Sequence, residues 1–350
     1  MTGQPALVAE HSVIHHKSPG KVRSLFSLSS RHVSDADLFK LGLRLIESLS
    51  EEEREHAARS SFKYLLKSVK QPPSPLDGIN AVTHKELKDE RDYYAARMAM
   101  RHLSSKKRNF EVALQKMKNA IQFRRDQDLD GLRLCFHVAE IPTLDAETLR
   151  RYAEYRERLE ERMATGRVYV QGYDKQGRAI YTIYAARTKD FDHDWFIKES
   201  LYNFERALAC TERESEGREE SITVIGNYTG FQSKHAAPMS LSHEFMDVLR
   251  QNYPGRVKRV YLLNTPTSFL FFWAIVKPFI GTETRKKIQF LSSEKQKEQE
   301  FAELVSLEQA APWMREGGKK CRDLQVNEYL HETAFDHAFD GWVLRASSLR

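Results

Sequence analysis

Apolar residues recur at helical spacing through the first part of the chain. Leucines three and four positions apart line one side of residues 35–49, and a second apolar stripe follows within residues 51–69. Ser50 and the three glutamates after it are typical of a capped helix with an acidic first turn. Three prolines in residues 71–75 then end helical structure, because proline cannot continue a helix. The pattern predicts two N-terminal helices and a linker that ends near Asn80.

Beyond the linker, helices continue and then alternate with strands. Residues 83–125 have the period of two or three helices. Residues 149–163 form a highly charged helix, which we expect to be exposed and supported by pairs of opposite charge one turn apart. Short β-rich stretches follow at residues 167–173, 179–184, 221–226 and 257–263, and helical periods separate or follow them at residues 194–210, 238–252 and 292–305. This alternation predicts an α/β layer with helices against a mixed sheet.

The stretch of residues 253–291 joins a buried-type strand to an unusually apolar helix. From Ser268 to Val276 no charged side chain occurs, and the run ends at Lys277 and Pro278. The run is about half as long as a helix that crosses a membrane, so we do not expect it to span a bilayer. Two interpretations remain open at this point. The helix is either buried in the core, or it has an apolar ligand on one side and a lysine at its end that meets a negative headgroup.

The order of short motifs in this part of the chain resembles the CRAL-TRIO family, the Sec-fourteen-like lipid-transfer proteins. The motifs are Tyr253-Pro254-Gly255-Arg256, Asn264-Thr265-Pro266, Trp273, Lys277-Pro278-Phe279-Ile280, and Thr284 with Lys287 and Ile288. The resemblance covers about residues 86–319. It implies a helical lobe followed by a CRAL-TRIO-like mixed sheet, flanked by helices around an apolar lipid cavity. It also implies that the apolar helix is a gate, with hinges at residues 264–266 and at Gly281.

The same resemblance implies which residues hold the lipid. Lys277 matches the gate lysine, Glu244 lies where a glutamate works with that lysine, and Lys106 and Lys107 precede the Phe110 turn of the lobe. These four residues are the expected headgroup set. The expected cavity and gate residues are Phe269, Phe271, Phe272, Trp273, Ile275, Val276, Phe279 and Ile280. Without the resemblance, Glu244 is a surface carboxylate and the two lysines belong to a solvated basic turn.

We therefore expect five segments along the chain. They are a flexible arm at residues 1–34, N-terminal helices with a Pro-rich linker at 35–80, the helical lobe at 81–145, the lipid-binding domain at 146–320, and a C-terminal helix at 321–350 that packs back onto the core.

Composition narrows the function further. The formal net charge of +6 over 350 residues favours anionic surfaces without demanding nucleic acid. Three widely spaced cysteines, Cys135, Cys210 and Cys321, fit reduced thiols in the cytoplasm, and their spacing suggests no metal site. The first residues lack the continuous apolar stretch of a signal peptide, so we expect no secretion. The chain also lacks a Gly-rich phosphate loop, a G-x-S-x-G elbow and an H-E-x-x-H pair, so we expect neither an enzyme nor a cofactor.

These observations favour a cytoplasmic lipid-transfer protein that encloses one phospholipid, phosphatidylinositol or phosphatidylcholine, and exchanges it at membranes through a mobile gate helix. Enclosure matters because exposing an acyl chain of about 16 carbons to water costs on the order of 13 kcal/mol. The expected partners are the phospholipid and, transiently, an anionic membrane surface, and a lipid kinase or another protein partner is compatible with the sequence. The alternatives are a protein-interaction scaffold and a sensor of small hydrophobic molecules without net transfer.

Overall fold

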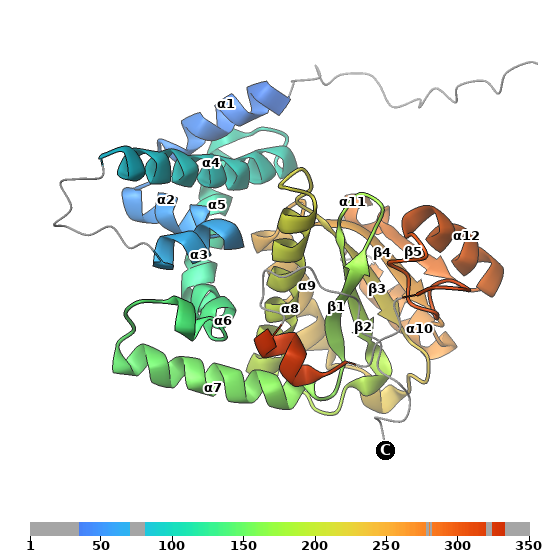
Figure 1. Cartoon of the computed structure of the whole chain (residues 1–350). Helices are drawn as coiled ribbons and strands as arrows, with labels where there is room; N and C mark the ends of the chain where they lie inside the picture. The colour runs from blue at the N-terminus through green and yellow to red at the C-terminus, as the bar shows by residue number, and fades with distance from the viewer. Residues whose placement is uncertain (1–34, 71–80, 278–279, 281, 320–323, 333–350) are drawn as a thin grey trace, which may run out of the picture.

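The computed structural model describes residues 35–70, 81–277, 280, 282–319 and 324–332. A lobe of helices precedes a sheet with helices on both sides, and Figure 1 shows the lobe beside one edge of the sheet layer. The expected N-terminal arm, the Pro-rich linker and most of the expected C-terminal helix lie outside the described residues.

The N-terminal half of the chain is helical. Its helices are α1 (Asp35–Ile46), α2 (Glu51–Ala58), α3 (Phe62–Lys70), α4 (Ala81–Ser105), α5 (Phe110–Asp126), α6 (Leu129–Leu134) and α7 (Ala146–Met163), with a 3₁₀ turn at Val138–Glu140. The expected cap of α2 is confirmed, because the Glu53 amide donates to Ser50 Oγ at 3.1 Å and the Ser50 amide donates to Glu53 Oε2 at 2.8 Å. The single helix expected over residues 51–69 is wrong. The chain turns after α2, and Ser61 Oγ accepts from the Tyr64 amide at 3.2 Å to start α3.

The exposed location expected for the charged helix α7 is also wrong for one of its faces. Tyr152, Tyr155, Leu159 and Met163 are buried against the core that surrounds α8. These residues lie three or four positions apart, so they form one stripe of the helix. The many charged residues between them hid this stripe in the sequence.

The sheet has five strands in the order β1-β2-β3-β4-β5. The strands are β1 (Val168–Tyr173), β2 (Ala179–Tyr184), β3 (Ile222–Asn227), β4 (Val257–Leu263) and β5 (Ile288–Leu291). The β1–β2 pair is antiparallel and the other pairs are parallel, so the expected mixed sheet is confirmed. The sequence pattern did not predict β5 as a strand.

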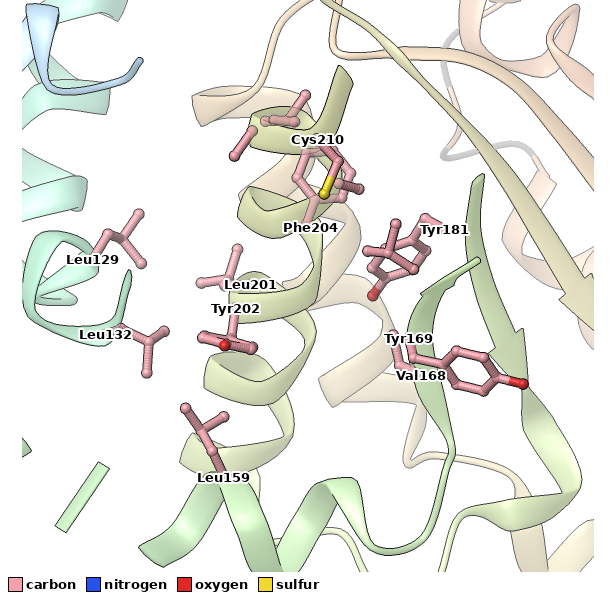
Figure 2. Close-up of a cluster of buried hydrophobic side chains, with 14 of the residues drawn as sticks. Leu129, Leu132, Leu159, Val168, Tyr169, Tyr181, Leu201, Tyr202, Phe204 and Cys210 are labelled. Atoms are coloured by element: carbon pink, nitrogen blue, oxygen red, sulfur yellow. The ribbon is translucent and has the colours of Figure 1, made fainter. Parts of the chain in front are cut away.

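Helices and short turns complete the sheet layer. They are α8 (His193–Glu214), α9 (Met239–Asn252), α10 (Thr267–Val276), α11 (Thr282–Arg285), α12 (Glu294–Leu304), 3₁₀ turns at Ala185–Arg187 and Ser233–His235, and a final helical turn at Glu328–Glu332. In Figure 1, α8 and α9 lie on one side of the sheet and α12 lies on the other. Figure 2 shows α8 between Leu129 and Leu132 of α6 on one side and Tyr181 of β2 on the other. α8 is therefore the central helix that joins the lobe to the sheet.

A buried ion cluster fixes this junction. Glu205 of α8 accepts from Arg124 Nη1 at 2.6 Å and from the Tyr253 hydroxyl at 2.7 Å, and Arg133 Nε lies 3.4 Å from its carboxylate. Burial alone would raise the pKa of Glu205, but Arg124 and Arg133 lower it to about 2. The carboxylate is therefore ionised at neutral pH and holds both arginines of the lobe.

The described end of the chain packs back onto the core, as expected. The Tyr329 hydroxyl donates to Asn203 Oδ1 at 2.9 Å and accepts from the Val170 amide at 3.0 Å. The Tyr329 carbonyl accepts from Arg206 Nη1 at 2.6 Å. This fully buried tyrosine therefore ties the final turn to both α8 and β1.

Candidate functional site

The two faces of the sheet differ in how far water reaches them. The face that packs against α12, which we call the sealed face, carries residues that are at most 3% exposed: Ile225, Tyr261, Leu263 and Leu291. The opposite face, which we call the half-open face, carries three half-buried residues in register across β3, β4 and β5: Val224, Val260 and Ile288. Strands with helices on both sides normally bury both faces. Helices therefore leave part of the half-open face uncovered.

Helix α10 covers the β5 end of the half-open face with aromatic rings. The ring centroids of Trp273 and Phe290 lie 5.4 Å apart, and those of Phe269 and Tyr228 lie 4.4 Å apart. At the other end of the same face, α8 buries Tyr181 of β2. α9 adds half-buried apolar residues from its own inner side: Phe245, Val248 and Leu249. The uncovered part of the face is thus framed by apolar groups from three helices.

The outer side of α10 is apolar as well. Leu270 is 46% exposed and Phe271 is 71% exposed, whereas Phe269 and Ile280 are buried. An exposed phenylalanine on an uncharged helix is typical of a surface that contacts a membrane or a partner. No helix in the described part of the chain is long and apolar enough to cross a membrane. Of the other expected gate residues, Phe279 and the side chains of Phe272, Ile275 and Val276 lie outside what the structure describes.

The structure places the four expected headgroup residues at three separate locations. Lys277 follows α10 and is exposed. Glu244 lies on α9 and pairs with His193 Nε2 of α8 at 2.6 Å, and no ion pair among the described residues joins it to Lys277. Lys106 and Lys107 lie in the turn between α4 and α5, where Lys107 has a left-handed backbone with a φ of 51°. The lysines are therefore accessible, and Glu244 has a partner that the sequence did not predict.

Lys287 is a further cation that the headgroup set did not include. It directly precedes β5, and its Nζ donates to the Val257 carbonyl at 2.7 Å. Burial and the nearby Lys258 lower its pKa. A signal for it exists in the sequence, because Lys287 belongs to the motif that includes Thr284 and Ile288. It could be interpreted only once β5 was known to begin there.

Comparisons with known proteins agree with this geometry. Residues 163–311 match the family model described as the CRAL/TRIO domain. The chain is 25% identical over 132 residues to a CRAL-TRIO domain-containing protein of Schizosaccharomyces pombe, covering 38% of this chain and 13% of that protein. It is 23% identical over 211 residues to the phosphatidylinositol/phosphatidylcholine transfer protein SFH7 of Arabidopsis thaliana, covering 57% of this chain and 35% of that protein. It is 24% identical over 258 residues to the phosphatidylinositol transfer protein PDR17 of Saccharomyces cerevisiae, covering 70% of this chain and 67% of that protein.

The crystal structure of Sfh5 has a similar fold. The two structures superpose with a TM-score of 0.50 at 15% sequence identity, over 76% of this chain and 84% of that one. At this identity the likeness extends to the fold alone. It covers a larger share of this chain than the match to the CRAL/TRIO domain does.

Proposed function

Because this chain contains a CRAL/TRIO domain distantly homologous to Sec-fourteen-like transfer proteins, we propose that it binds one phospholipid against the half-open face and carries it between membranes. The lipid is phosphatidylinositol or phosphatidylcholine, and exchange takes place at an anionic cytoplasmic membrane surface. The protein acts as a carrier and not as an enzyme.

The incomplete burial of the half-open face is the observation that carries this proposal. Val224, Val260 and Ile288 lie in the three central and edge strands, where apolar residues gain most from full burial. An acyl chain laid against them removes apolar surface of both partners from water. Since each buried CH₂ is worth about 0.8 kcal/mol, a chain of about 16 carbons supplies a large favourable term. A phospholipid tail is therefore a fitting occupant of this face.

The same energy demands a movable wall, which we assign to α10. A rigid enclosure would trap the lipid, since its tails cannot cross water without losing this stabilisation. The segment begins after Asn264, whose φ of 53° is a left-handed conformation that interrupts regular structure. Phe271 and Leu270 on the outer side supply apolar contact with a bilayer. We therefore propose that α10 closes in solution and swings outward at a membrane.

The headgroup is the polar part that must remain near the opening of the enclosure. Lys277 at the end of α10 supplies a positive charge for its phosphate, and Lys106 and Lys107 supply further charge from the lobe. Glu244 belongs to the same proposal through its contact with His193, which links α8 to α9 beside the gate. Arg285 and Lys286 of the α11 region follow the gate and favour an anionic bilayer.

A transfer assay between vesicles tests the proposal. The protein should move labelled phosphatidylinositol or phosphatidylcholine from donor to acceptor vesicles. Val260→Trp fills the half-open face and should lower the transfer rate at least about tenfold, because the indole occupies the volume that the acyl chain needs. Val112→Trp is the matched control, since Val112 is 44% exposed on α5, far from this face.

The outcomes separate the candidate functions. If Val260→Trp transfers lipid at the wild-type rate, the half-open face is not the binding surface. If the wild-type protein retains phospholipid in stoichiometric amount but transfers none, it is a sensor. If it neither binds nor transfers lipid, the scaffold alternative replaces the carrier.

A further inference from the structure

A second concave site lies between the helical lobe and the sheet layer. It is a cavity of about 760 Å³ lined by α3, α4, the end of α8 and the loop before β3, and we call it the interlobe pocket. Its volume falls in the range of small-molecule sites, roughly 300–1,000 Å³. The three half-buried residues of the half-open face are not part of its lining. The pocket is therefore a separate location from the proposed lipid surface.

Three arginines meet at one carboxylate in the wall of this pocket. Glu220 Oε1 accepts from Arg101 Nη1 at 2.6 Å and from Arg97 Nε at 3.1 Å, and the Glu220 carbonyl accepts from Arg256 Nη1 at 2.9 Å. Burial would raise the pKa of Glu220, but these arginines lower it to about 2. The group therefore consists of three positive charges around one negative charge.

Two of these guanidinium groups have donors to spare. Within the described part of the chain, the Arg101 side chain donates one hydrogen bond and the Arg256 side chain donates one, both to Glu220. A guanidinium has five N–H groups in a fixed fork that matches a phosphate or carboxylate. Both side chains line the interlobe pocket. Their remaining N–H groups are thus available to an anion in that cavity.

The carboxylates nearby do not neutralise this excess, because they are already engaged. Glu219 accepts two hydrogen bonds from Arg178, at 2.8 and 2.9 Å, and Glu212 accepts from Ser61 Oγ at 2.7 Å. On the lobe side, Lys63 of α3 adds an exposed cation to the lining. Burial and the neighbouring Arg256 lower the pKa of Arg101, as expected where positive charges are close together.

A buried polar atom beside the cluster also lacks a partner. His102 is 1% exposed, and its Nε2 has no hydrogen-bond partner within the described residues. It lines a small extension next to the pocket, together with Arg101 and Arg256. Buried polar atoms of side chains are normally hydrogen-bonded, so an unpaired one next to a cavity points to a missing ligand or water.

From this geometry we propose that the interlobe pocket binds a soluble organic phosphate that carries at least two negative charges. The phosphate lies against Arg101 and Arg256, and the rings of Tyr93 and Tyr94 form the wall for its organic part. Such a ligand contacts α3 and α4 of the lobe and the end of α8 at the same time. It therefore bridges the lobe and the sheet layer, which goes beyond the proposed carriage of lipid.

Calorimetric titration with inorganic pyrophosphate, at near-physiological salt, tests the proposal. The wild-type protein should bind pyrophosphate, and Arg101→Gln should bind it at least about tenfold more weakly, because a charge-assisted contact is lost. Arg250→Gln is the control, since Arg250 is an exposed arginine on α9 outside the pocket lining, and it should bind like the wild type. If the wild type does not bind pyrophosphate, or if Arg101→Gln binds it equally well, the proposal is overturned.

Two further arms keep the result clear. Lys63→Glu changes an exposed side chain, so it should fold normally and still weaken pyrophosphate binding several-fold. Unchanged binding in this variant would contradict the lobe's part in the site. A lipid headgroup is the other source of the same chemistry, so Arg101→Gln is also compared with wild type in the phosphatidylinositol transfer assay. If Arg101→Gln loses transfer while pyrophosphate fails to bind the wild type, the pocket holds a lipid headgroup and no soluble ligand.

Discussion

The sealed face and the half-open face are built from the same strands and from similar apolar residues. Ile225 on the sealed face is fully buried, whereas Val224, its neighbour in β3, is half-buried on the other face. The strand sequence does not distinguish these two environments. The difference arises from the helices outside the sheet, since α12 covers one face and α10 frames the other. Incomplete cover on one side of a well-packed sheet is thus the physical signature of a surface reserved for another molecule.

One isoleucine on each face provides the largest and most direct contrast. Ile225→Ala should lower the free energy of unfolding by about 4 kcal/mol, because it leaves a cavity in a fully packed region. Ile288→Ala on the half-open face should cost about 1 kcal/mol, because that side chain is already partly in contact with water. Urea unfolding of the lipid-free proteins measures both values. Equal losses would mean that the two faces are equally packed.

A second large effect concerns the lobe junction, which is as well sealed as the sealed face but by charge. Glu205→Gln should lower the free energy of unfolding by about 3 kcal/mol at pH 7, because Arg124 and Arg133 then lose their buried carboxylate. The folded pKa of Glu205, about 2, lies below the value of about 4.3 for an unfolded glutamate. Its stabilisation is therefore complete above about pH 4.3 and is lost as the pH falls toward 2.

Urea unfolding over a range of pH checks this sign. The difference in stability between wild type and Glu205→Gln should be largest near neutral pH and should shrink as the pH falls from about 4.3 toward 2. A constant difference across this window would show that the carboxylate is not held by the arginines.

The outer side of α10 should matter for membranes and hardly at all for stability. Phe271→Ser should change the free energy of unfolding by no more than about 0.5 kcal/mol, since its side chain is 71% exposed. Flotation with anionic vesicles should nevertheless recover clearly less of this variant than of wild type. Val112→Ser removes an exposed apolar side chain from α5 and should float like the wild type. Equal flotation of all three proteins would place membrane contact elsewhere.

The smallest expected effect on stability belongs to Lys277. Lys277→Ala should leave unfolding unchanged within error, because this exposed side chain has no ion pair among the described residues. Transfer of phosphatidylinositol between vesicles should fall several-fold, because the phosphate loses its opposite charge. Lys295→Ala on α12, at the sealed side of the sheet, should transfer lipid normally. A wild-type rate for Lys277→Ala would remove the headgroup role of this lysine.

Much of the architecture could be read from the residue pattern. β4 spans Val257–Leu263 as expected, and the apolar run after it forms α10 within one residue of its expected start. The strand β5 was missed because four residues are too few to show a period. The buried stripe of α7 was missed because charged residues surround it. Local patterns detect long elements and fail for short or heavily charged ones.

The candidate sites were harder to predict, because they depend on contacts between distant segments. Glu244 meets His193 of another helix, and the arginines of the interlobe pocket meet Glu220 from two separate elements. No spacing in the sequence brings these groups together. The half-open face shows the same limit, since its exposure is set by helices that lie far from β3 in the chain.

The central claim is that the half-open face holds a phospholipid, and mass spectrometry of the purified protein tests it most directly. An organic extract of the wild-type protein should contain close to one phospholipid per chain, phosphatidylinositol or phosphatidylcholine. The same extract of Val260→Trp should contain much less, while Val112→Trp should match the wild type. A wild-type protein without phospholipid, or a Val260→Trp protein with a full complement, would contradict the account.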